Sequence, residues 1–239
     1  MSAINPAHHD EGLTLRQAAL TVGFVGLIML GTAPFANFVA FPKVLIPGDI
    51  EQTAQNIVTH RGLFLAGTFA YLINYVCDVL IAWALYVLLV PVNRSVSLLA
   101  AWFRLMYTAT ALFGLFKLVD VFHLLNMPDY LTVFGSQQLH AQVKLLLDSF
   151  RFEWGVGLVF FDIHLVLVGY LVYRSGYIPR IFGILLAIDG LGWLIDNLSP
   201  YLYPNAHLGF ISITWYGELI FGFWLLFKGW KIQQPAAHS

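Results

Sequence analysis

The chain has 239 residues, of which 59% are hydrophobic and 10% are charged, and its mean hydropathy is +0.75. An average soluble domain carries roughly 25% charged residues, so this composition excludes an ordinary water-soluble domain. The net charge of −1 at pH 7 excludes a basic nucleic-acid-binding surface, which needs lysine and arginine to neutralise phosphates. The single cysteine, Cys77, excludes an internal disulfide and is expected to be a small core residue.

The predicted elements, in chain order, are helices that cross a membrane. A spanning helix needs about 20 predominantly apolar residues, whereas an outer-membrane strand needs only about 10 with alternating polarity. Apolar runs of helical length lie at 15–40, 62–90, 97–126, 153–173, 180–199 and 208–230. The sequence therefore predicts an all-α, polytopic bundle of six transmembrane helices in one domain, residues 15–230, with tails at 1–14 and 231–239.

The distribution of positive charge predicts the orientation of the bundle, because cytoplasmic flanks of spanning helices retain lysine and arginine. One side consists of the two termini and the second and fourth loops, and it contains Arg16, Arg94, Arg174, Arg180, Lys228 and Lys231. The other side spreads its charges over longer loops, at Lys43, Arg61, Lys144 and Arg151. We therefore expect both termini to be cytoplasmic.

Two loops on the outer side are predicted to form short amphipathic helices. In PGDIEQTAQNIVTH, Asp49 can cap a helix, and Gln52 follows three residues later. In SQQLHAQVKLLLDSF, Ser136 is the expected cap of a helix with one apolar face. Both helices are expected on or near the outer membrane surface, over the mouth of the bundle. Simple connectors that happen to be amphipathic are the alternative.

Ionisable residues inside the spans are the main functional signal, because each costs about 2.5–3.5 kcal/mol at the bilayer centre. Those expected near the midplane are Asp78, Asp162, His164, Asp189 and Glu218. Those expected toward the outer half are Lys117, Asp120, His123, Glu153 and Asp196. Arg104 lies on the inner part of the third span, and Asp78 or Glu218 is its expected partner.

Helical spacing, at about 100° per residue, predicts which of these groups share a face. Asp189 and Asp196 share one face, Glu153 and His164 share another, and Asp162 points toward a different interface. We expect a cavity open to the outer side, lined by His123, Glu153, His164, Asp189 and Asp196, with Lys117 and Asp120 at its rim. Carboxyl groups so close together in a medium of low dielectric cannot all be ionised, so some are expected to carry protons.

Other chemistry has weaker support in the sequence. His123 and His164 do not form an HxxxH or HExxH pair, so no metal site is predicted. No P-loop or dinucleotide-binding glycine pattern occurs, and no cofactor is predicted. The polar residues could also serve only to join helices, at about 0.6 kcal/mol each.

Several segments together resemble a known family. They are IPGD with TAQNI, DVLIAWALYVLLVPVNRS followed by FRL, FFDIHLVLVGYLVYRSGYIPR, GWLID, and GEL before WLLFKG. They are similar, from about Lys43 to Gly229, to an uncharacterised group of bacterial polytopic membrane proteins classified as a domain of unknown function. The resemblance implies a bacterial inner-membrane protein and carries over no catalytic residues. The family usually has a small residue near the position of Asp162, which indicates that this carboxyl is particular to this chain.

The leading hypothesis is that the bundle binds a small lipophilic molecule from the membrane or the outer side. Acid/base chemistry on that molecule would use His164 as base or proton shuttle, with Asp189 and Asp196 as tuned carboxyl groups. The candidate ligand-binding residues are His123, Glu153, Lys117, Asp120, Asp78, Glu218 and Arg104. The competing classes are a proton-coupled transporter or carrier and a structural or accessory subunit. Membrane lipids are expected partners, and the sequence leaves the oligomeric state and any enzymatic activity open.

Overall fold

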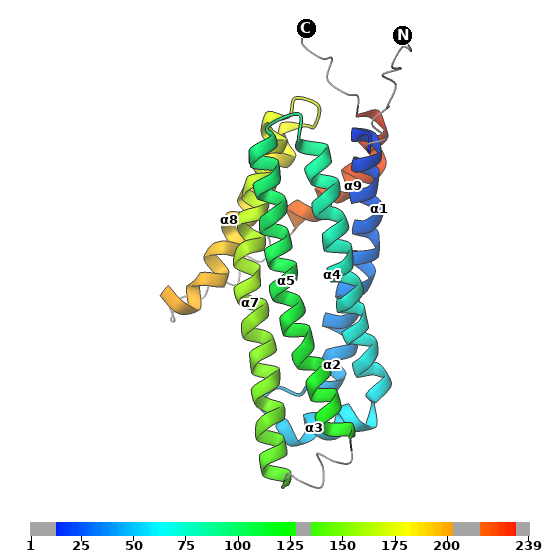
Figure 1. Ribbon diagram of the computed structural model, residues 1–239, viewed down its shortest axis with the longest axis vertical. Helices are drawn as coiled ribbons and strands as arrows, with labels where there is room; N and C mark the ends of the chain where they lie inside the picture. Colours follow the sequence, from blue (N-terminus) through cyan, green and yellow to red (C-terminus); the bar gives the residue numbers. More distant parts are fainter. Residues whose placement is uncertain (1–12, 128–134, 203–215, 233–239) are drawn as a thin grey trace, which may run out of the picture.

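The structure, a computed structural model, describes residues 13–127, 135–202 and 216–232, and these residues are almost entirely helical with no strand among them. Figure 1 shows an elongated bundle whose long helices run along one axis. The helices are α1 (Leu15–Pro34), α2 (Phe41–Val44), α3 (Ile50–Thr59), α4 (Arg61–Leu89), α5 (Arg94–Asn126), α7 (Ser136–Arg174), α8 (Arg180–Leu202) and α9 (Tyr216–Lys228).

Five helical segments of the described chain are long and apolar enough to cross a membrane. They are Leu15–Val44, Arg61–Leu89, Arg94–Asn126, Ser136–Arg174 and Arg180–Ser199. These segments confirm the predicted class, an all-α protein with several membrane-spanning helices. The sixth predicted span, at 208–230, lies partly outside the described residues, and α9 covers its second part.

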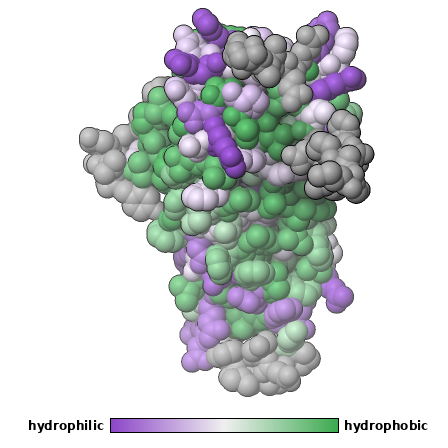
Figure 2. Space-filling model, turned by 45° about the horizontal axis from the view of Figure 1, so that its top comes forward, coloured by the Kyte–Doolittle hydropathy of each residue, from purple (hydrophilic) through white to green (hydrophobic). Residues whose placement is uncertain are grey.

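The described chain starts and finishes at the same end of the bundle. The short 3₁₀ turn Gly229–Lys231 follows α9 and packs beside the start of α1, with Gly229 against Ala19. The α4–α5 and α7–α8 connections lie at this same end, whereas α2 and α3 lie at the opposite end (Figure 1). On the face shown in Figure 2, apolar side chains cover most of the middle and polar ones gather toward both ends.

The helices α5 and α7 are longer than one membrane crossing requires. They have 33 and 39 residues, which correspond to about 50 and 58 Å, against a hydrocarbon core about 30 Å thick. Both helices are therefore longer than the hydrocarbon core is thick, and α3 packs against them through Ala54 and Ile57.

The first span continues past its predicted end at residue 40 as far as Val44. Pro34 has no N–H and interrupts the regular hydrogen-bond ladder, and the next six residues, Phe35–Ala40, form a π-helical segment. In this wider segment the Asn37 side chain donates to the Ala33 carbonyl at 3.0 Å and accepts from the Tyr71 hydroxyl at 2.7 Å. The wide turn thus ties the first span to α4.

One of the two predicted loop helices is confirmed as a helix, and the other is part of a longer helix. In α3, Asp49 accepts a hydrogen bond from the Gln52 backbone N–H at 2.9 Å, as the predicted cap requires. The prediction of a separate helix starting with a Ser136 cap is wrong, because α7 runs without a break to Arg174 and Gly135 occupies the cap position. The apolar face of its first part is covered by α5 and α3, with Val143 fully buried, so this segment belongs to the bundle.

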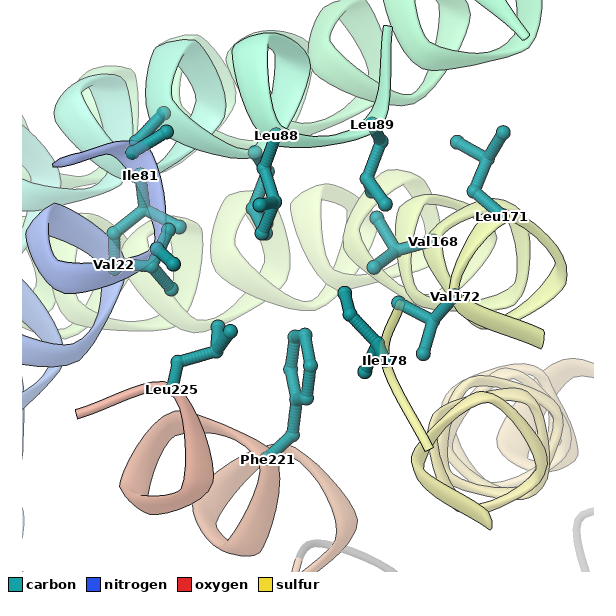
Figure 3. Close-up of a cluster of buried hydrophobic side chains, with 14 of the residues drawn as sticks. Val22, Ile81, Leu88, Leu89, Val168, Leu171, Val172, Ile178, Phe221 and Leu225 are labelled. Carbon is teal, nitrogen blue, oxygen red and sulfur yellow. The ribbon is translucent and has the colours of Figure 1, made fainter. Parts of the chain in front are cut away.

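Two apolar clusters fill the interior, one toward each end. The first lies near the α4–α5 and α7–α8 connections, and Figure 3 shows side chains from five segments meeting there, among them Leu88, Leu89, Val172, Ile178 and Leu225. The second lies toward α3, and its fully buried members include Val44, Ile57, Phe64, Leu118 and Val143. The buried residues Asp78 and Arg104 lie between these clusters, since Cys77 and Ala100 belong to the first and Tyr75 and Tyr107 to the second.

The α7–α8 pair is held close by glycine. A Cβ atom at Gly183 would lie 2.5 Å from the Tyr173 backbone nitrogen and 2.6 Å from the Gly169 carbonyl oxygen, distances too short for any side chain. At the turn between the helices, Gly176 has a φ of +75°, a value that favours glycine. The Tyr177 hydroxyl of this turn donates to the Leu88 carbonyl of α4, and burial raises the pKa of that hydroxyl.

We expect Gly183→Ala to destabilise the purified protein by about 1–3 kcal/mol, because the added methyl group forces α7 and α8 apart. Gly31→Ala is the matched control, since a Cβ there meets no atom within 4 Å. Thermal unfolding in mild detergent measures both. Equal melting temperatures for the two variants would show that close contact at Gly183 is not needed.

Candidate functional site

Arg104 of α5 is enclosed by the bundle, with 1% of its surface exposed. Its Nη2 lies 2.6 Å from Oδ1 of Asp78 on α4, and its Nε donates to the same oxygen at 2.9 Å. Its Nη1 lies 3.4 Å from Oε1 of Glu218 on α9. The guanidinium also lies over the ring of Phe161, 5.0 Å from its centroid. The predicted pairing of Arg104 with Asp78 or Glu218 is confirmed, and both acids take part.

His164 of α7 is held in one tautomer by its neighbours. Its Nδ1 lies 2.8 Å from the Ala100 carbonyl oxygen, and its Nε2 lies 3.2 Å from Nη1 of Arg104. A carbonyl oxygen only accepts and a guanidinium only donates, so Nδ1 carries the proton and Nε2 accepts. The ring is therefore neutral, and both of its nitrogens have partners within the protein.

The charged side chains form a layer across the bundle. Asp78, Arg104, His164, Asp189 and Glu218 each lie nine to eleven residues from the end of their helix at the side of the α4–α5 connection. At 1.5 Å per residue this places all of them about 15 Å from that side, which is half of a hydrocarbon core about 30 Å thick. Five helices thus contribute polar groups at one depth.

Asp189 connects α8 to the first turn of α9. Its Oδ2 accepts a hydrogen bond from the Glu218 backbone N–H at 3.1 Å. A carboxylate in this position is favourable, because the first N–H groups of a helix have no partner within it and carry partial positive charge. Gly217 permits the approach, since a Cβ there would lie 3.0 Å from the Leu185 carbonyl oxygen. The contact fixes the position of the Glu218 backbone, from which the side chain extends to Arg104.

A cavity of about 620 Å³ lies beside this layer, between α1, α4, α5, α7, α8 and α9. Small-molecule sites typically have volumes of roughly 300–1,000 Å³ and mostly apolar walls with a few polar groups. Apolar and aromatic residues make up most of this lining, and its ionisable groups are Asp78, Arg104, Asp162, His164, Asp189 and Glu218. The cavity therefore has the size and the chemistry of a ligand site.

The cavity is bounded differently on its two sides. Toward the α4–α5 connection its wall consists of Leu85, Val168 and Leu186, which belong to the first apolar cluster. Toward α1 the lining includes Leu27 and Phe38, whose side chains are 40% and 78% exposed on the apolar surface. The cavity thus reaches the side of the bundle, whereas the sequence predicted an opening toward the outer end.

Oδ2 of Asp78 and the hydroxyl oxygen of Tyr75, both from residues of the lining, have no hydrogen-bond partner among the described residues. The two residues are 0% and 2% exposed. A buried polar atom without a partner costs about 1–3 kcal/mol, so these two atoms need an explanation.

Asp162 faces the α7–α8 interface, in agreement with its predicted direction away from Glu153 and His164. It is 1% exposed, and its Oδ2 accepts a hydrogen bond from the Asn197 side chain at 2.9 Å. It also lines the cavity, so it shares this site with His164 after all.

Five predicted site residues are not part of the cavity lining. They are Lys117, Asp120, His123, Glu153 and Asp196. Lys117 lies about 20 Å along α5 from Arg104, beyond the residues of that helix that line the cavity. Glu153 lies next to Trp154, which lines the cavity, but Glu153 faces α5, since a Cβ at Gly114 would lie 3.7 Å from the Glu153 Cβ. Asp120 and His123 are exposed, and α8 leans away from the bundle toward its end beyond Asp196 (Figure 1).

The structure adds residues that the sequence had not singled out. Tyr75, Tyr107, Trp154, Phe161 and Trp193 line the cavity. Tyr71, Tyr75 and Asp78 follow one another at helical spacing, and this pattern could have placed Tyr75 on the polar face of α4. In the part of the chain that the structure describes, no three His, Cys, Asp or Glu side chains are grouped so that they could hold a metal ion.

These features define a multi-span helical membrane protein with a buried ionic layer beside a cavity that reaches the side of the bundle. The family model described as Domain of unknown function (DUF4386) matches residues 21–229, and the chain belongs to this family. A curated relative from Archaeoglobus fulgidus, described as "Uncharacterized protein", is 36% identical over 186 residues, which cover 78% of this chain and 91% of the relative. No solved structure matches. The resemblance noted in the sequence is confirmed, and neither description assigns an activity.

We expect the buried Arg104–Asp78 pair to be strongly coupled. Arg104→Met leaves the Asp78 carboxyl without its cation and should destabilise the protein by about 3–5 kcal/mol, whereas Arg104→Met combined with Asp78→Leu should recover most of this loss. Detergent-driven unfolding of the two single variants and the double variant measures the coupling.

The exposed Lys144–Asp148 pair of α7 is the matched control. The same cycle with Lys144→Met and Asp148→Leu should change stability by less than about 1 kcal/mol. If the losses of stability caused by Arg104→Met and Asp78→Leu add up in the double variant, the two side chains are not coupled.

Proposed function

We propose that this protein binds a small lipophilic molecule within the membrane, in the cavity beside the Arg104 layer. The observation that carries the proposal is the combination of a cavity of about 620 Å³ with buried charged groups in its wall. Ionisable residues inside spanning helices are rare and usually functional, because they are expensive to bury. A tightly packed accessory subunit would not need such a cavity.

The position of the cavity favours access from the bilayer. Its lining continues to Leu27 and Phe38 on the apolar surface of the first span. At the other side its wall consists of Leu85, Val168 and Leu186 of the first apolar cluster. The same cluster continues to Leu88 and Val172 (Figure 3). A carrier needs a polar path to both faces of the membrane, so this closure supports binding over transport.

The proposal does not require acid/base chemistry. His164, the candidate base, accepts from Arg104 through Nε2 and donates to Ala100 through Nδ1. A general base needs a free acceptor within reach of the ligand's proton. We therefore assign His164 the role of a positioning residue, which holds the guanidinium toward Asp78 and Glu218.

We further propose six membrane crossings with both termini in the cytoplasm, and the bacterial cytoplasmic membrane as the location. The start of α1 and the Gly229–Lys231 turn lie side by side, which requires an even number of crossings. A sixth crossing that includes α9 satisfies this requirement. Arg94, Arg174 and Arg180 lie at this same end, as expected for the cytoplasmic side.

We expect protein isolated in mild detergent to retain a lipophilic small molecule that solvent extraction and mass spectrometry detect. Gly222→Phe should reduce the retained amount at least about tenfold, because a Cβ there meets no protein atom within 4 Å and the residue lines the cavity. Gly31→Phe adds the same side chain outside the lining and should have no effect. Equal retention by both variants, or no retained molecule in the unmodified protein, would contradict the proposal.

Cysteine labelling in intact cells tests the orientation. In a Cys77→Ala background, Glu51→Cys on α3 should react with a membrane-impermeant maleimide, and Ser95→Cys at the start of α5 should react only after the membrane is permeabilised. Both positions are exposed, so a difference reports the side of the membrane. The reverse labelling pattern would show that both termini lie on the outer side of the membrane.

A further inference from the structure

We propose that the ligand of this cavity is a lipophilic cation, an organic ammonium ion whose charge is bound by Asp78 and whose body packs against aromatic side chains. This inference rests on the proposed binding function and specifies the chemical class of the ligand. The same ammonium group could belong to a free amine or to the headgroup of an aminophospholipid.

The first argument is the charge of the group that Arg104 forms with Asp78, Glu218 and His164. Arg104 contacts the carboxyl groups of both Asp78 and Glu218, at 2.6 and 3.4 Å. His164 is neutral because its Nε2 accepts from Arg104. When Asp78 and Glu218 are both ionised, the single guanidinium leaves one negative charge in excess. Their side chains are 1% and 33% exposed, and a charge on the buried Asp78 is stable only when it is paired. One further positive charge would neutralise the group.

The second argument is the pair of unpartnered atoms. Oδ2 of Asp78 only accepts when the carboxyl group is ionised, and its other oxygen is already bound to Arg104. The Tyr75 hydroxyl can also accept, and both residues line the cavity. An ammonium group carries several N–H donors and can therefore donate to both atoms, whereas an anion would meet a carboxylate and be repelled.

The third argument is the aromatic wall. Ring faces attract cations, and quaternary ammonium groups are commonly bound in aromatic cages. The rings that line the cavity include Tyr71, Tyr75, Tyr107, Trp154, Phe161 and Trp193. Phe161 already has the Arg104 guanidinium over its face. A cation with an apolar body would therefore find both its charge and its surface matched.

The test uses three probes with one body and different charge: 4-phenylbutylammonium, 4-phenylbutanol and 4-phenylbutyrate. Each is titrated against the full chain in detergent at pH 7, with tryptophan fluorescence and thermal stabilisation as readouts, because Trp154 and Trp193 line the cavity. We expect the ammonium probe to bind at least about tenfold more tightly than the alcohol and the carboxylate to bind most weakly.

Two tyrosine variants separate binding from folding. Tyr75→Phe removes a hydroxyl that has no partner among the described residues, so it should weaken ammonium binding about tenfold without lowering the melting temperature. Tyr177→Phe removes the hydrogen bond to Leu88 outside the cavity, so it should lower the melting temperature without changing affinity. Asp78→Asn should reduce the ammonium affinity further, and Tyr75→Phe keeps the test informative if that variant does not fold.

The outcomes distinguish the two proposals. If alcohol and ammonium bind equally and Gly222→Phe abolishes both, the cavity binds lipophilic molecules and the cation preference is overturned. If the ammonium probe does not bind, or Tyr75→Phe leaves its affinity unchanged, this inference fails, while the retained-molecule experiment still decides the binding function.

Repeating the titration in phosphatidylethanolamine and phosphatidylglycerol nanodiscs identifies the source of the cation. If the ammonium probe binds more weakly in phosphatidylethanolamine nanodiscs than in phosphatidylglycerol nanodiscs, the lipid headgroup competes with it and is the cation. If the probe binds equally in both, the cation is a free amine.

Discussion

The ion pair between Arg104 and Asp78 is the constraint on which the arrangement of the spans depends. Neither group can be exposed to lipid, and neither can be buried alone. The pair therefore fixes α4 against α5, and its contacts with His164 and Glu218 extend this constraint to α7 and α9. Apolar packing in the clusters on either side is less directional, so the polar layer determines the register of these helices.

The class of fold follows from the sequence because bilayer thickness translates directly into runs of apolar residues. The cap at Asp49 and the pairing of Arg104 were also predictable, since both are local or strongly limited by charge. The continuous α7 was not, because the helix after Ser136 and the apolar run at 153–173 were predicted as separate elements, and a helix that leaves the membrane changes polarity without bending. A surface helix and a protruding bundle helix have similar patterns.

The site was predicted in part, and depth explains the difference. Helical spacing indicates the direction in which a side chain points, but convergence also requires the same height along the bundle. His164 and Asp189 satisfy both conditions, whereas Lys117 and His123 lie farther along α5 than the residues of that helix that line the cavity. Tyr75 was missed because a tyrosine in an apolar run is ordinarily a core residue, and its role depends on a cavity that α1 and α9 complete from distant parts of the sequence.

The depth of the layer also has an electrical meaning. A charge about 15 Å from one surface of a hydrocarbon core 30 Å thick has crossed about half of the transmembrane voltage, which corresponds to about 1 kcal/mol per 100 mV for each elementary charge. Occupancy by a charged molecule would thus differ between an energised and a de-energised cell, and it would depend on which face of the membrane the molecule came from.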